Sequence, residues 1–258
     1  MVADMLNMSS IVAHSENMRV QVGDQEYKGT FMNKAEGFDP RNLKDLQTLK
    51  ELTPESLTAT PEFLRDLANL QLLDYICGNS DRHFNNILCK VEERDGKLVL
   101  TGLMGIDNDT SLGAANYSVA KNLMHFVSLK DIKFIPRKTA ESIMALKPEM
   151  LRTMLAGFDL SDKEIDGAVK RLGEVKEAIN NAWATKAFTE KGKIKNSDRN
   201  NFLTIVDEED MKDISVVKQL YNDKGAFVKN KKEKENYNLY TRMEIALTFG
   251  AMYSNIGD

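Results

Sequence analysis

The residues best suited to chemistry are a group of polar side chains that two runs of apolar sequence should bring together. Asp81, Arg82, His83 and Asn86 occur in the run DRHFNN, and Asp107 follows after two short apolar segments. Magnesium prefers hard oxygen ligands and commonly takes one or two carboxylates together with phosphate oxygens. A carboxylate can also accept or orient the proton of a hydroxyl group. The pattern therefore suits the binding of a divalent cation beside phosphate oxygens.

A helix is predicted immediately before these residues. Thr60 and Pro61 have the residue types of an N-cap and a first helical position. Apolar residues follow at helical spacing and should form its buried face: Phe63, Leu67, Leu70, Leu73 and Ile76. Gly78 should end the helix, so that Asp81 follows a rigid element, as the positioning of a catalytic group requires.

A β-hairpin is predicted between Asn86 and Asp107. The segments 87–91 and 97–101 alternate around Asp95-Gly96, which is a strong hairpin signal. The hairpin should return Asp107 to the side of Asn86, with Asp109 as a further or substitute metal ligand.

Structural readings of the same residues stay open at this stage. Asp81 could bond local backbone at the end of a helix, and His83 could simply pack beneath a loop. IDNDTS, at positions 106–111, also suits an Asx-rich turn. A calcium loop fits less well, because the spaced acidic positions and the terminal Glu of an EF-hand are missing. For Arg82 we expect a charge-assisted hydrogen bond that holds the loop.

Two segments resemble a known family. DRHFNN resembles the DRHxxN catalytic loop of the phosphatidylinositol-kinase-like branch of the kinase superfamily, which also includes the HipA-type bacterial toxin kinases. GIDND resembles the IDFG metal-binding segment of that branch, with Asp107 at its Asp, and departs from it at Asn108 and Asp109. The resemblance implies an α+β, kinase-like fold with a small β remnant of the N-lobe and a mostly helical C-lobe.

The resemblance also implies cofactors, an acceptor and site residues. ATP would donate its γ-phosphoryl group, with Mg²⁺ or Mn²⁺, to a hydroxyl of a protein, lipid or small molecule. The catalytic residues would be Asp81, Arg82 and His83, and the metal ligands Asn86, Asp107 and Asp109.

The start of the chain is predicted to form a partial N-lobe. Two strands, 18–22 and 27–32, flank the turn residues Gly23 and Asp24. MNKAEG, at positions 32–37, resembles the kinase hinge, whose residues here would contact adenine: Met32, Lys34 and Glu36. A surface turn is an equally good reading. The expected division is a partial N-lobe and hinge at 1–37 and a C-lobe at 38–258.

Part of the kinase pattern is missing upstream of that hinge. No GxGxxG loop is present, and Lys28 and Lys34 lie too near the hinge for the lysine that pairs with phosphate. Three explanations stay open: a truncated N-lobe, a reduced fold, or a pseudokinase that acts as a binding scaffold. Transfer of AMP in place of phosphate is a further alternative.

Helices should support the site from the C-terminal side. Ser161 and Glu164 have the spacing of a capping box. The expected helices are 40–50, 138–146, 148–155, one with the apolar stripe Ile165, Val169, Leu172 and Ile179, 211–220 and 237–249. The remaining segments are expected to be an activation segment at 110–122, a loop at 186–199, and a lysine-rich linker or phosphate-docking patch at 229–234.

The composition is that of an ordinary soluble globular protein. The 258 residues are 42% hydrophobic and 29% charged, with a formal net charge of -4. That charge argues against general nucleic-acid binding, which needs a basic face. No apolar run is long enough to span a membrane, and MVADMLNMSS lacks the features of a signal peptide. Cys77 and Cys89 suggest no disulfide framework, so we expect the cytosol, including that of a cell into which an effector is delivered. No oligomeric state is predicted.

Overall fold

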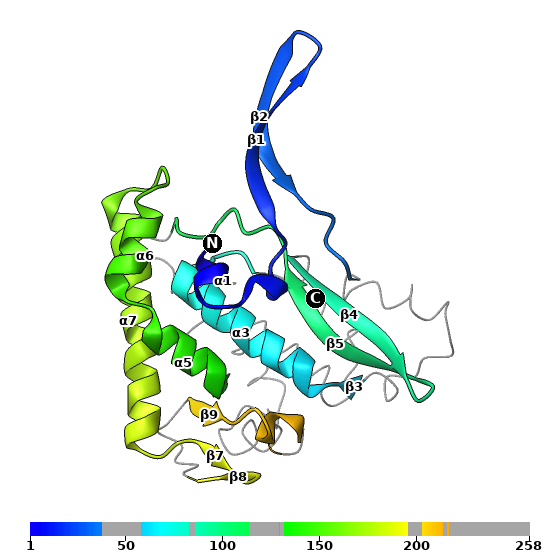
Figure 1. Ribbon diagram of the computed structural model, residues 1–258, viewed down its shortest axis with the longest axis vertical. Coiled ribbons are helices and arrows are strands. Elements are labelled where there is room, and N and C mark those ends of the chain that lie inside the picture. The colour runs from blue at the N-terminus through cyan, green and yellow to red at the C-terminus, as the bar shows by residue number, and fades with distance from the viewer. Residues whose placement is uncertain are drawn as a thin grey trace, which may run out of the picture.

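A buried helix, α3 (Pro61–Cys77), forms the centre of the protein. The computed structural model describes residues 1–37, 58–82, 86–113, 129, 132–195, 203–213 and 216. In Figure 1, α3 lies between a sheet on one side and three helices on the other. The fold is therefore a mixture of α-helix and β-strand, as predicted, whereas its division into kinase lobes stays a prediction.

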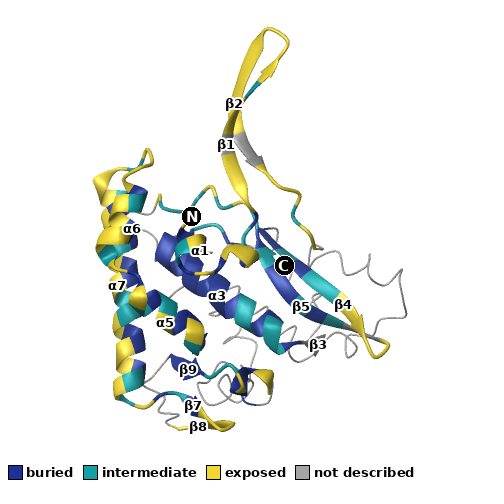
Figure 2. Ribbon diagram, viewed as in Figure 1, coloured by how far each residue is buried: buried dark blue, intermediate teal, exposed yellow. Residues whose placement is uncertain are grey.

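The start and end of α3 are those predicted from the sequence. The Thr60 hydroxyl accepts a hydrogen bond from Phe63 N (3.3 Å), and Pro61 is the first helical residue. Gly78 ends the helix with φ 67°, a left-handed conformation that suits glycine. The five apolar residues expected on its buried face are all buried. Figure 2 shows α3 buried along most of its length, so it belongs to the core and is not a surface helix.

The sheet beside α3 contains the predicted hairpin. Its strand order is β3-β5-β4, with β4 and β5 antiparallel and β3 parallel to β5. The turn residues Asp95 and Gly96 have φ 53° and 73°, which matches the twist of a tight hairpin. Ile87 pairs with Gly105, so the start and end of the hairpin lie side by side. The strands are β3 (Thr58–Ala59), β4 (Ile87–Arg94) and β5 (Lys97–Gly105).

The first residues of the chain pack into the core. They include α1 (Val2–Met5) and a 3-10 turn, η1 (Ser9–Ile11). Leu6, Met8 and Ile11 are each 1% exposed, and Ala13 N donates to Gly105 O (3.0 Å). This segment therefore contributes directly to the support of α3 and β5.

A two-stranded arm follows, made of β1 (Ser15–Val22) and β2 (Gln25–Met32). The strands are antiparallel and longer than predicted. Neither pairs with another strand in the described part of the chain. Figure 1 shows the arm projecting away from the body, and Figure 2 shows it exposed along almost its whole length.

Three predicted helices are present on the other side of α3. They are α5 (Arg137–Ala145), α6 (Pro148–Leu155) and α7 (Asp162–Ala184). The capping box of Ser161 and Glu164 is formed at the start of α7. Ile165, Leu172 and Ile179 are buried, whereas Val169 is only partly buried. None of the helices in the described residues has the length and apolar composition needed to cross a membrane.

Short strands were the main elements that sequence patterns missed. Residues 186–195, expected to be loop, contain a small hairpin, and the parallel pair β6–β9 was not predicted. Strands of two or three residues are too short to show a periodic pattern. These strands are β6 (Phe134–Pro136), β7 (Thr189–Glu190), β8 (Lys193–Ile194) and β9 (Thr204–Val206). A 3-10 turn, η6 (Asp210–Lys212), occupies the start of the helix expected at 211–220.

Several predicted segments lie outside the described residues. They are His83, the helices at 40–50 and 237–249, residues 217–220, the lysine-rich stretch at 229–234, and positions 114–122 of the expected activation segment.

Candidate active site

The C-terminal end of α3 leads into the candidate site through a tightly bonded turn. Gly78 N donates to Tyr75 O (3.1 Å), and Asn79 N donates to Asp74 O (2.9 Å). This pair of bonds is a Schellman motif, which satisfies carbonyl groups that the helix itself leaves unpaired. The turn therefore sets the direction in which the chain leaves the helix.

The next two carbonyl groups of α3 are bonded by residues from elsewhere in the chain. Ile76 O accepts from Arg171 Nε (3.0 Å), and Cys77 O accepts from Leu112 N (2.7 Å). Arg171 belongs to α7, and Leu112 lies beyond the segment that contains Asp107. All four terminal carbonyls of the helix are thus satisfied, and the helix end is joined to two other segments of the chain.

Arg82 connects the same parts of the molecule through its guanidinium group. The side chain is fully buried and bonds both oxygens of Asp74 (2.9 and 3.0 Å). It also donates to the backbone carbonyls of Asn86 and Ile106 (2.7 Å each) and to the amide oxygen of Asn108. The charge-assisted bond expected for Arg82 is therefore present, with Asp74 as its partner.

The Asn79 side chain links Asp74, Asp81 and Thr110. Its Nδ2 donates to Asp74 Oδ1 (3.2 Å), while its Oδ1 accepts from Asp81 N (2.9 Å) and the Thr110 hydroxyl (3.1 Å). The side chain is fully buried. Asp81, which is partly buried, is consequently held through its backbone next to the helix end.

Asn86 lies between Asp81 and the segment that carries Asp107. Its Nδ2 donates to Asp81 O (2.9 Å), and its backbone carbonyl accepts from Ile106 N (2.9 Å). No described residue donates to Asn86 Oδ1, so this oxygen is free to act as a ligand. Asp107 is exposed and has φ 52°. The structure therefore brings Asp81 and Asn86 together with the GIDND segment, as the hairpin predicted.

A close backbone approach makes this meeting possible. At Gly105, a Cβ atom would lie 2.9 Å from Leu70 Cδ1 and 3.1 Å from the Arg82 guanidinium. Contacts at that distance are shorter than carbon–carbon packing allows. Glycine at this position therefore lets β5 pass directly over α3 and Arg82.

Oxygen ligands for a cation are present, although they form no preassembled cluster. In the described residues, no three His, Cys, Asp or Glu side chains gather at a common point. Asp107 and Asp109 are both exposed, and Asn86 offers an amide oxygen to which none of the described residues donates. Two carboxylates with one amide match the donors that magnesium takes when phosphate supplies further ligands.

The residues expected to contact adenine lie at the end of the arm. Met32 is the last residue of β2, and Lys34 and Glu36 follow it with exposed side chains. Gly37 then lies against β4, where a Cβ atom would be 2.8 Å from Cys89 O. The segment therefore reaches the strand that begins after Asn86, but no described contact joins its three candidate residues to Asp81 or Asp107.

A hollow of about 430 Å³ lies behind the Asp74–Arg82 network. Asp74, Asn108 and Leu112 line one side of it, and the first residues of the chain line the other. Cys77 also lines this hollow, and burial raises the pKa of its thiol to about 12. The thiol is therefore protonated near neutral pH and is unsuited to nucleophilic attack.

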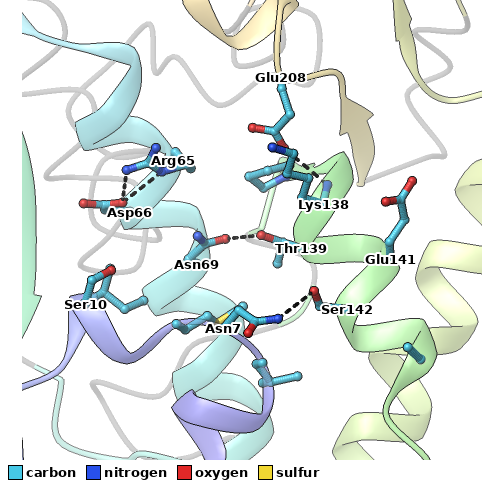
Figure 3. Close-up of a pocket in the computed structure, with 15 residues that line it drawn as sticks. Asn7, Ser10, Arg65, Asp66, Asn69, Lys138, Thr139, Glu141, Ser142 and Glu208 are labelled. Atoms are coloured by element: carbon cyan, nitrogen blue, oxygen red, sulfur yellow. Dashed lines mark hydrogen bonds and ion pairs between the residues drawn. The ribbon is translucent and has the colours of Figure 1, made fainter.

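A second hollow, of about 780 Å³, lies between α3 and α5 and is separate from the candidate site. Figure 3 shows polar pairs across it: Thr139 donates to Asn69 (2.9 Å), and Asn7 donates to Ser142 (3.3 Å). Asp66 is bonded by Arg65 there, and burial raises the pKa of its carboxyl group. None of the predicted site residues lines this hollow.

Three supporting residues were missed by the sequence patterns. Asp74 is an acid within an apolar helical run, and a buried charge requires a partner, so its position was a usable signal. Asn108 occupies the position at which the chain departs from the IDFG pattern, and its side chain bonds Arg82. Asn79 gave no signal beyond its place after the helix-ending glycine.

Comparison with known proteins identifies the family. No curated protein matches the chain. The family model described as "Phosphatidylinositol 3- and 4-kinase" matches residues 2–157, which is more than half of the chain and includes the segments that form the candidate site. The protein therefore belongs to the phosphatidylinositol 3- and 4-kinase family.

Proposed function

We propose that this protein transfers the γ-phosphoryl group of ATP to a hydroxyl group in a reaction that requires a divalent cation, preferably Mg²⁺. The observation that carries the proposal is the contact between Asn86 and Ile106, which places the loop containing Asp81 beside the segment containing Asp107. Family membership supports the same reaction class, because kinases transfer phosphate mainly by positioning reactants and neutralising charge.

Each predicted residue has a distinct role in this proposal. Asp81 accepts or orients the proton of the acceptor hydroxyl, which contributes about 10²- to 10⁴-fold to rate. Asn86 and Asp107 hold the cation, and Asp109 is a second carboxylate ligand. The bond from Asn86 Nδ2 to Asp81 O fixes the orientation of the Asn86 amide. Its oxygen, to which no described residue donates, is then the atom left to bind the cation. The bound cation would neutralise the phosphate oxygens.

Arg82 supports these groups without facing the reactants. It is fully buried, and its guanidinium bonds Asp74, Asn108 and the backbone carbonyls of Asn86 and Ile106. His83 keeps its predicted place in the catalytic loop, and Met32, Lys34 and Glu36 are proposed to contact adenine. The acceptor is a protein, lipid or small molecule with an accessible hydroxyl.

The first test is calorimetric titration of ATP with and without Mg²⁺, using the wild type and D107N. We expect binding that depends on Mg²⁺ in the wild type and is lost in D107N, because the substitution removes a charged ligand. Asparagine tolerates the left-handed conformation of Asp107 (φ 52°), so the fold should be retained.

The chain provides a matched control for this test. Asp95, at the hairpin turn, has φ 53° and is also exposed, so D95N makes the same chemical change in the same backbone conformation away from the site. It should bind ATP as the wild type does. Equal Mg²⁺-dependent binding by D107N and D95N would rule out the proposed metal site.

Turnover separates a kinase from a nucleotide-binding scaffold. With ATP and Mg²⁺, D81N should lose phosphate transfer by about 10²-fold or more while it retains nucleotide binding. Mass analysis of a modified acceptor distinguishes the addition of phosphate from that of AMP. Metal-dependent binding without any product, in the wild type and with varied acceptors, would favour the scaffold.

A further inference from the structure

Helix α7 contacts the candidate site, although it lies outside the residues that match the family model. The match ends at residue 157, and α7 begins at Asp162. Arg171 projects from α7 toward the C-terminal turn of α3 and is 1% exposed. A long, fully charged side chain is rarely buried to this extent without a specific set of contacts, so its surroundings are informative.

The Arg171 guanidinium lies against the turn that ends α3. Its Nε donates to Ile76 O (3.0 Å), and a Cβ atom at Gly78 would lie 2.7 Å from its central carbon. A cation at the C-terminus of a helix is stabilised by the helix dipole. Burial acts in the opposite direction and lowers the pKa of the guanidinium. The side chain therefore caps the helix electrostatically and occupies the space beside Gly78.

The position of this turn determines the position of the catalytic loop. Gly78 has φ 67°, and three residues later the chain reaches Asp81, whose backbone is held by Asn79. The turn has little freedom, because its own amides are bonded to Tyr75 and Asp74. A shift at Gly78 would thus be transmitted to Asp81 without loss of the surrounding core.

From this arrangement, we propose that Arg171 is a positioning residue for the catalytic loop, through which α7 fixes the path of the chain from Gly78 to Asp81. The inference rests on the proposed phosphotransfer function for its kinetic consequence. Its structural consequence is independent of that function. A displacement of about 1 Å at a reacting group can reduce a rate by roughly 10²-fold.

The test compares R171M with Y75F, which changes another polar contact between the same two helices. Tyr75 donates to Glu174 on α7 (2.5 Å), whereas the carbonyl of Ile76 accepts from Arg171. R171M removes the guanidinium but retains an unbranched side chain of similar length. Both variants should weaken the packing of α7 on α3, whereas only R171M should loosen the turn.

Two measurements on the full chain test the positioning role of Arg171. The first is amide hydrogen exchange at Gly78, Asn79 and Leu112, which should accelerate in R171M more than in Y75F. The second is phosphate release from Mg·ATP below the unfolding temperature. R171M should lower kcat by about tenfold or more with little change in KM for ATP, and R171K, which keeps the cation, should recover part of the rate.

The two readouts also separate this inference from the proposed function. Faster exchange at the turn in R171M but not in Y75F supports the positioning role, whether or not the wild type turns over ATP. Absence of turnover in the wild type would count against the proposed function alone. Equal exchange at these amides in R171M and Y75F, or a wild-type kcat in R171M, would overturn the positioning role.

Discussion

The end of α3 and the arm formed by β1 and β2 differ in how many parts of the chain bond to them. At the end of α3, four backbone carbonyls and a buried ion pair are bonded by residues from several segments. In the arm, the two strands bond only each other among the described residues, and an isolated hairpin is marginally stable in water. The end of α3, where charged groups meet, is therefore held by many bonds, whereas the described bonds between the two strands of the arm hold the strands only to each other.

The two arginine–carboxylate pairs should show the largest difference between these regions. R82M leaves the Asp74 carboxylate buried without its main partner, and removing one member of a buried ion pair costs about 3–5 kcal/mol. In the arm, Arg19 lies 3.7 Å from Glu26 with both side chains well exposed, and such pairs contribute less than about 1 kcal/mol. Urea denaturation of R82M and R19M measures both costs. Similar losses of unfolding free energy in the two variants would contradict the comparison.

Sequence patterns predicted the elements on both sides of this comparison. The cap at Thr60, the glycine that ends α3, and the Asp95-Gly96 turn are local signals, and each has a physical cause within a few residues. The order of these elements also predicted that Asn86 and the Asp107 segment would meet. Local chemistry and connectivity were sufficient for that part of the site.

The contacts that fix the site could not be predicted in the same way. Arg171 bonds a carbonyl 95 positions earlier, and Arg82 bonds a side chain 26 positions later. Such contacts depend on how the helices and strands pack, and no periodic pattern encodes them. The exposure of the arm was equally hidden, because the alternation of its strands is the same whether or not another element covers them.

Core packing provides the second comparison. Leu103 on β5 is fully buried, and L103A should cost about 2–5 kcal/mol through lost transfer energy and the cavity that remains. Val22, near the tip of the arm, is 60% exposed, so V22A should change stability by no more than about 0.5 kcal/mol. The denaturation midpoints of L103A and V22A, compared at constant m-value, measure the two changes in stability. A large cost for V22A would indicate that Val22 is covered in solution.

Two glycines with left-handed backbones provide the finest comparison. Gly78 and Gly23 have φ 67° and 61°, so alanine is strained by roughly 1–2 kcal/mol at either position. At Gly78 the new methyl group would also meet the Arg171 guanidinium, whereas nothing lies within 4 Å of a Cβ at Gly23. G78A should therefore lower the free energy of unfolding of the whole protein by more than about 2 kcal/mol.

The strain of G23A should remain within the arm, because a hairpin with few outside contacts can open before the core unfolds. Hydrogen exchange should then be faster at the amides of β1 and β2 while the global unfolding transition is unchanged.

A combined variant, G78A with R171M, tests the origin of the additional cost at Gly78. If the clash with the Arg171 guanidinium is the reason for the additional cost at Gly78, removing that group should reduce the cost of alanine toward the value expected from φ alone. A cost that is the same in both backgrounds would place the strain in the backbone and not in the contact with α7.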